Sequence, residues 1–246
     1  MKNQTIQFIG HIRQLGLAAL LTTGLTIQAQ TLVGSGGEHV DVGAAYDETA
    51  NEWELHVHDE DNDVEYFPAM DARLFVGYGA NTTVPVGPLW SFLGTAGNQS
   101  WILPNAPTPG LMLLGLAAEE ITTGIFVGDQ IMFKLKAVSG PGSFAVFDLD
   151  PFNDPIVLFN SLDGISGADS HVLPTGAHQD VNWAFGASGD YTITFEASGI
   201  STLNGATTSG DVDYLFRVEA VPEPATGALA GVGALALLLV RKMRRN

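Results

Sequence analysis

Cysteine is absent from the 246-residue chain, and basic residues are scarce. The missing thiols exclude a disulfide scaffold, a zinc site built on thiolates, a thioredoxin-like motif and a cysteine nucleophile. Ten Lys and Arg residues stand against 27 Asp and Glu residues, which gives a formal net charge of −17. Because contact with nucleic-acid phosphates requires clustered Lys and Arg, we expect no nucleic-acid partner.

The few basic residues are concentrated at the two ends of the chain, where the sequence is also apolar. Only four lie in the middle, namely Arg73, Lys134, Lys136 and Arg217. Nearly all the acidic residues lie there too, so two short basic ends flank an acidic body. The 29 glycines and 12 prolines, with 46% hydrophobic residues, are typical of a turn-rich all-β protein.

The N-terminal segment predicts a secretory signal peptide over residues 1–29. A weakly basic start that includes Arg13 precedes an apolar run at 15–27, which is too short to span a bilayer comfortably. Ala29 then supplies a small residue for cleavage. The alternative is a buried core helix. A signal peptide would direct the chain to the Sec translocon.

The C-terminal segment, residues 221–246, has a proline-rich start, an apolar stretch and a basic end. Pro222 and Pro224 cannot continue a strand, so they mark a linker. The apolar stretch at 225–240 predicts a transmembrane helix of about 24 Å, short of a hydrocarbon core of about 30 Å. Snorkelling of Arg241 and Lys242 and inclusion of Met243 can make up the difference. The basic end should stay cytoplasmic, and its residues are Arg241, Lys242, Arg244 and Arg245.

The order of these parts resembles the PEP-CTERM sorting signal of Gram-negative bacteria. The matching elements are Pro222-Glu223-Pro224, the Gly- and Ala-rich helix and the terminal basic cluster. The resemblance implies that an exosortase, a membrane-embedded transpeptidase, recognises the Pro-Glu-Pro segment and cuts nearby. The body would then pass to the envelope, the surface or the exopolysaccharide matrix. An ordinary single-span anchor remains the alternative, with the same topology before cleavage.

The body, residues 31–220, alternates apolar and polar residues with the period of two that predicts β-strands. In residues 52–58, for example, Trp53, Leu55 and Val57 share one face. Further strands are expected at 39–46, 73–78, 131–137, 144–147, 156–159, 190–196 and 213–218. No long amphipathic helix is evident, so we predict an all-β fold, an antiparallel β-sandwich of immunoglobulin-like or jelly-roll type.

Short motifs spread over residues 37–218 carry a second resemblance. They are Gly37-Glu-His-Val-Asp41, Phe92-Leu-Gly94, Trp101-Ile-Leu-Pro104, Gly115, Glu119-Glu-Ile121, Gly140-Pro-Gly142, Ser161-Leu-Asp-Gly164, Gly176-Ala-His178, Asn182-Trp-Ala-Phe185 and Gly189-Asp-Tyr191. In this order they resemble the choice-of-anchor M domain, which is related to a repeat of surface-anchored actinobacterial proteins. The resemblance implies a non-enzymatic domain whose members carry different surface anchors, and an association with metal-type ABC transporters. Relatives often carry His-x-His where this chain has His178-Gln-Asp180, although Asp can replace His as a ligand.

Three pairs of polar residues have the two-residue spacing that places both side chains on one face of a strand. They are His39 with Asp41, His56 with His58, and His178 with Asp180. Imidazole and carboxylate suit Zn²⁺ or Mn²⁺, so His39, Asp41 and His178 form a candidate metal site that His58 or Asp180 could complete. The alternatives are a solvent-facing strand for His56 and His58, and structural hydrogen bonds for His39 and His178.

Other candidate chemistry is less specific. The run Asp59-Glu-Asp-Asn-Asp63 lacks the Gly and distal Glu of an EF-hand loop, so we interpret it as an acidic turn. No Gly-x-Ser-x-Gly elbow and no phosphate-binding loop occurs. Three tryptophans could line a sugar platform if they were exposed, but a core position is the usual alternative. These are Trp90, Trp101 and Trp183.

The sequence therefore predicts an exported, non-enzymatic protein of the cell surface or extracellular matrix, sorted through its C-terminal signal. Export would bring it to the Sec translocon and an exosortase, with exopolysaccharide as a further candidate partner. The alternative is an extracytoplasmic Zn²⁺- or Mn²⁺-binding module linked to metal uptake. A polysaccharide-active enzyme is a third reading, although nothing selects a catalytic pair of carboxylates.

Overall fold

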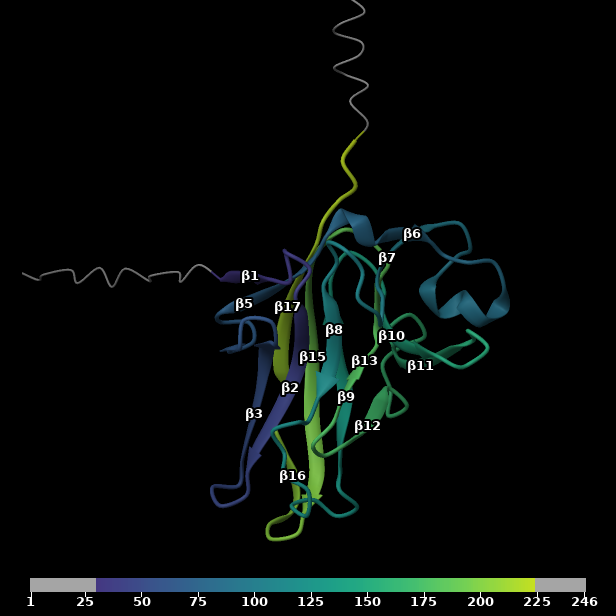
Figure 1. Ribbon diagram of the computed structural model, residues 1–246. Helices are drawn as coiled ribbons and strands as arrows, with labels where there is room; N and C mark the ends of the chain where they lie inside the picture. The colour runs from purple at the N-terminus through teal and green to yellow at the C-terminus, as the bar shows by residue number, and fades with distance from the viewer. Residues whose placement is uncertain (1–29, 224–246) are drawn as a thin grey trace, which may run out of the picture.

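A computed structural model describes residues 30–223. The predicted signal peptide, with Ala29, and the predicted C-terminal helix and basic cluster lie outside these residues. Among the described residues, no helix is long and apolar enough to cross a membrane. Figure 1 shows both ends of the described chain leaving the same end of the body, where β1 and β17 both pair with β5.

Seventeen strands and two short 3₁₀ helices make up the described chain, arranged in three sheets. The largest sheet contains β1 (Thr31–Val33), β5 (Ala72–Val76), β17 (Val212–Val218), β15 (Gly189–Ser201), β9 (Gln130–Ser139) and β12 (Ser170–Pro174) in that order, with β16 (Gly205–Thr208) paired to β15. The second contains β11 (Pro155–Asn160), β10 (Phe144–Leu149), β14 (Asn182–Phe185), β7 (Gln99–Leu103) and β6 (Asn81–Thr83). The 3₁₀ helices η1 (Tyr78–Ala80) and η2 (Pro88–Leu93) flank β6.

The third sheet positions the candidate site. Its strands are β13 (His178–Asp180), β8 (Leu113–Ala117), β2 (His39–Asp47), β3 (Glu52–Asp59) and β4 (Val64–Tyr66), in that order. The inner face of this sheet is apolar: Val40 and Val42 on β2 and Val57 on β3 are almost fully buried. Because side chains alternate along a strand, His39 and Asp41 project from the opposite face.

The all-β class is confirmed, but the expected purely antiparallel pairing is wrong. The pairs β1–β5, β5–β17 and β2–β8 are parallel. Parallel neighbours need a long crossover, and between β2 and β8 the chain forms β3 to β7 before it returns. The immunoglobulin-like or jelly-roll topology stays a prediction.

One hydrophobic core joins the three sheets. Trp183 on β14 is fully buried, and its indole N–H donates a 2.9 Å hydrogen bond to the carbonyl of Leu114 on β8. Its ring lies 5.9 Å from that of Phe216 on β17. Burial of such aromatic side chains, each about 150–250 Å², holds the apolar face of the third sheet against the core and leaves its polar face outward.

Candidate functional site

The candidate site forms on the outward face of the third sheet, where strand register aligns polar residues in rows. One row runs across all five strands, since cross-strand partners project on the same face. It consists of Asp180, Gly115, Asp41, His58 and Glu65. The neighbouring row pairs His178 with Ala117, Ala117 with Gly43, and Gly43 with His56. Sequence-distant side chains therefore meet on one surface.

Gly115 leaves space for the side chains beside it in the first row. It lies between Asp41 and Asp180, and a Cβ at this position would collide with Oδ1 of Asp41 and lie 3.3 Å from Oδ1 of Asp180. Because glycine has no side chain, the two carboxylates reach toward each other across β8. The absent side chain thus creates the space in which the polar groups gather.

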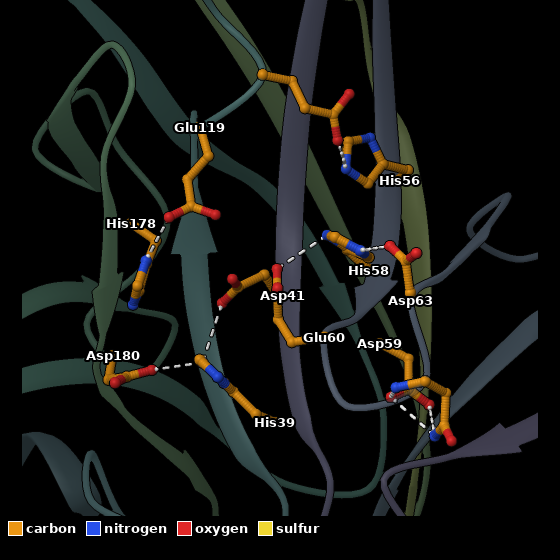
Figure 2. A network of polar contacts seen from close by, with 12 residues as sticks. His39, Asp41, His56, His58, Asp59, Glu60, Asp63, Glu119, His178 and Asp180 are labelled. Carbon is orange, nitrogen blue, oxygen red and sulfur yellow. Dashed lines mark hydrogen bonds and ion pairs between the residues drawn. The ribbon is translucent and has the colours of Figure 1, made fainter.

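Four of the predicted ligands come together in this space (Figure 2). His39 Nε2 lies 3.1 Å from Asp180 Oδ1 and 3.9 Å from Asp41 Oδ1. The rings of His39 and His178 have centroids 5.6 Å apart. Ligand atoms of His39, His178 and Asp180 lie within 4.8 Å of one another. These separations allow one divalent ion to contact several of the four residues after small side-chain movements.

Asp41 is the unusual member of the group. Its side chain is fully buried, yet neither carboxylate oxygen has a hydrogen-bond partner among the described residues. Burial raises the pKa of Asp41 from 3.8 to about 6, with His39 and His178 opposing the rise. A buried carboxylate without a partner is costly, and a bound cation is one way to satisfy it.

Glu119, which the sequence did not indicate as a site residue, supports His178. Its Oε1 lies 2.7 Å from His178 Nδ1, and this hydrogen bond is the main cause of the raised pKa of His178. In Figure 2 the second ring nitrogen of His178 points toward Asp180. A carboxylate on one ring nitrogen fixes the tautomer that leaves the other free to bind a metal. In the sequence, the signal that could have indicated Glu119 as a site residue was its position just after a buried strand, 113–117.

His56 and His58 do not face solvent, so the alternative of a solvent-facing strand at 52–58 is wrong for them. His56 is only 3% exposed, because its ring lies over Gly43 and its Nε2 contacts Glu120 at 3.2 Å. His58 is half-buried, and its Nδ1 lies 2.9 Å from Glu60. His58 also stands beside Asp41 in the strand register, so it borders the candidate site.

The acidic turn holds itself together through local hydrogen bonds. The carboxylate of Asp59 accepts bonds from the backbone and side-chain amides of Asn62. Asp61 accepts a 3.0 Å bond from the backbone N–H of His39, which ties the turn to the start of β2. These contacts agree with the interpretation of the run as a turn.

Two of the three tryptophans are unsuited to a sugar platform. Trp101 is 4% exposed and Trp183 is fully buried in the core. Trp90 is partly buried and packs with Phe92 and Phe147 in a smaller cluster. The core interpretation therefore holds for Trp101 and Trp183.

Positive charge on the described chain lies elsewhere. Its four Lys and Arg residues pair with carboxylates of the largest sheet or its loops: Arg73 and Arg217 with Asp190, and Lys134 and Lys136 with Glu196. Among the described residues, the carboxylates around Asp41 are therefore balanced only by imidazoles. Such a surface has the electrostatic character of a cation-binding site.

Comparison with known proteins identifies the C-terminal segment. A profile of the PEP-CTERM protein-sorting motif matches residues 220–245. Neither the curated proteins nor the solved structures gave a match to the chain. The motif implies an exported protein that an exosortase processes and that reaches the cell envelope or surface. The choice-of-anchor M resemblance of the body stays a prediction.

Proposed function

We propose that the chain is a non-enzymatic protein of the cell surface or extracellular matrix, released from the inner membrane when exosortase cuts its tail. The sorting motif at 220–245 carries this proposal. Export would begin at the Sec translocon, and the C-terminal helix would anchor the protein until cleavage. Exopolysaccharide is the proposed matrix component around the released body.

The junction between body and tail supports release of an intact body. The last strand, β17, ends at Val218. Glu219 makes the final contacts: its N–H donates to Val76, and its carboxylate accepts from the N–H of Tyr78. Pro222 and Glu223, by contrast, are exposed. Among the described residues, no hydrogen bond involves the segment that follows Glu219, so cleavage near the Pro-Glu-Pro segment leaves the hydrogen bonds of the β-body in place.

Intact-mass measurement on protein from the native host tests this proposal. We expect a mature form that lacks about the first 29 residues and ends near Pro222. Substitution of Pro222 and Pro224 by Ala should leave the tail uncut, whereas Pro107→Ala, in an exposed loop, should be processed normally. A wild-type mature form that retains residues 225–246 would instead establish a simple membrane anchor.

A second function, divalent-cation binding by the exported body, is favoured by the unpartnered carboxylate of Asp41. We propose that His39, Asp41 and His178 hold a Zn²⁺ or Mn²⁺ ion, with Asp180 as a further ligand. Two imidazoles and two carboxylates offer the nitrogen and oxygen donors that both ions accept. Such a module could serve metal uptake, as the family resemblance implies.

Thermal melts of the mature protein test cation binding. An ion that binds only the folded state at a hundredfold excess over its Kd adds about 2.7 kcal/mol of stability. For a domain of this size, that corresponds to a rise in Tm of about 5–11 °C. A His39→Ala/His178→Ala variant should show no rise, while His171→Ala, outside the group, should behave as wild type. No shift in wild type, or an equal shift in the double variant, would remove this function.

A further inference from the structure

A second cluster of histidine and carboxylate side chains lies beside the first on the same sheet face. It surrounds a small cavity of about 60 Å³, which is large enough for an ion with a bound water. The cavity is lined by Gly43, His56, His58, Ala117, Glu119 and Glu120. Small residues, Gly43, Ala44 and Ala117, make up part of the lining and leave room between the polar side chains.

His56 distinguishes this cavity from an ordinary acidic patch. Its side chain is only 4% exposed, and Nδ1 has no hydrogen-bond partner among the described residues. Nε2 lies 3.2 Å from Glu120 Oε1, and Glu65 brings a third ligand atom within 4.8 Å. The ring fits against the sheet only because residue 43 is glycine, where a Cβ would collide with Nε2.

The loop after β8 joins the two clusters. Glu119 and Glu120 are consecutive, yet Glu119 contacts His178 and Glu120 contacts His56. A single turn of chain therefore supplies one carboxylate to each histidine. Figure 2 shows His56 and His58 projecting from the same face as Asp41, between strands that the register makes adjacent.

We propose that His56, Glu120 and Glu65 hold a second divalent cation, at the point where His56 and Glu120 line this cavity. One imidazole and two carboxylates form a hard, oxygen-rich set that suits Mn²⁺ or Zn²⁺. The position uses none of His39, Asp41, His178 or Asp180, so it stands apart from the cation binding proposed above. The sheet face as a whole then takes two ions per chain.

Binding stoichiometry of the mature protein, measured by equilibrium dialysis with Mn²⁺ and separately with Zn²⁺, tests this proposal. We expect two ions per chain for wild type and one for Glu120→Gln. His39→Ala/His178→Ala should also bind one ion, and the combined variant none. Glu54→Gln removes an exposed carboxylate two residues before His56 on β3 and should keep both ions.

Glu120 is the deciding residue because it is 41% exposed, so its amide variant should fold normally even if His56→Asn does not. Unchanged stoichiometry in Glu120→Gln would overturn the second position, whatever the first one does. One ion in wild type that only His39→Ala/His178→Ala removes leaves the first position alone. One ion that only Glu120→Gln removes supports the second position and removes the first.

Discussion

Replacement of Asp41 by Asn should make the metal-free protein more stable at neutral pH. Asp41 is fully buried and its two oxygens lack hydrogen-bond partners among the described residues. The isosteric amide carries no charge, and its NH₂ group can donate to the nearby carboxylates of Asp180 and Glu60, which a carboxylate cannot do. A side chain retained for binding rather than for stability would behave in this way.

The raised pKa of Asp41 determines how large the stability gain of Asp41→Asn should be. Its value in the folded protein is about 6, against 3.8 for the free group. A one-unit change in pKa corresponds to about 1.4 kcal/mol, so ionised Asp41 lowers the free energy of unfolding by about 3 kcal/mol. For a domain of this size, Asp41→Asn should raise the Tm by about 6–12 °C at pH 8.

The pH dependence follows from proton binding. Between pH 3.8 and about 6 the folded state holds more protons at Asp41 than the unfolded state does. The contribution of Asp41 to the free energy of unfolding therefore falls as the pH rises through that window. Above the window, the full cost of burying the ionised carboxylate remains. Below the window Asp41 is neutral in both states, so the advantage of Asp41→Asn should disappear.

Urea unfolding in the presence of a chelator, at a pH below 3.8 and at pH 8, measures the stability gain of Asp41→Asn and its loss in acid. Glu54→Gln, an exposed carboxylate on the same sheet, should change stability by less than about 0.5 kcal/mol at either pH. With Zn²⁺ added, wild type should gain stability and Asp41→Asn should gain much less. If Asp41→Asn is no more stable than wild type at pH 8, the buried carboxylate does not destabilise the protein, and the argument for a cation beside it loses its basis.

Two further substitutions test how the site is built. Gly115→Ala should destabilise the protein by about 1–3 kcal/mol and abolish Zn²⁺ binding, because its Cβ collides with Asp41; Gly167→Ala, where a Cβ meets nothing within 4 Å, should do neither in the same melts. Glu119→Gln should lower the pKa of His178 in an NMR titration and weaken Zn²⁺ binding about 10- to 100-fold. An unchanged His178 titration would show that Glu119 does not hold this ring in solution.

The sequence was sufficient to place eight of the seventeen strands of the body, among them every strand of six or more residues. Alternation at 39–46 and 52–58 corresponds to β2 and β3, and the runs at 131–137 and 190–196 lie within β9 and β15. Each of these strands directs its apolar side chains to one face, toward the core, so the period of two is visible in the residues themselves. The same alternation placed His39 and Asp41 on one face without a structure.

Sequence reasoning was less informative about which strands are neighbours. The parallel pairing of β2 with β8 depends on packing of residues more than 60 positions apart, which no local pattern encodes. Gly115 had no visible role in the sequence, because its importance lies in the space that it leaves for Asp41. His56 was misjudged for the same reason: Glu120 and Gly43, both remote in sequence, determine its burial.

Cation binding and stability are linked in this sheet. The strands bring Asp41, Asp180, Glu60 and Glu119 around two imidazoles, and the four Lys and Arg residues of the described chain pair with carboxylates elsewhere. In the proposed function, a bound ion offsets the cost of the buried charge, so binding free energy becomes folding free energy. In the metal-free body the contribution of Asp41 to stability should therefore be lowest above about pH 6, where Asp41 is ionised. The ionised carboxylate is also the form that a Zn²⁺ or Mn²⁺ ion requires of this ligand, so the condition under which Asp41 most destabilises the metal-free site is the one that favours binding of the ion.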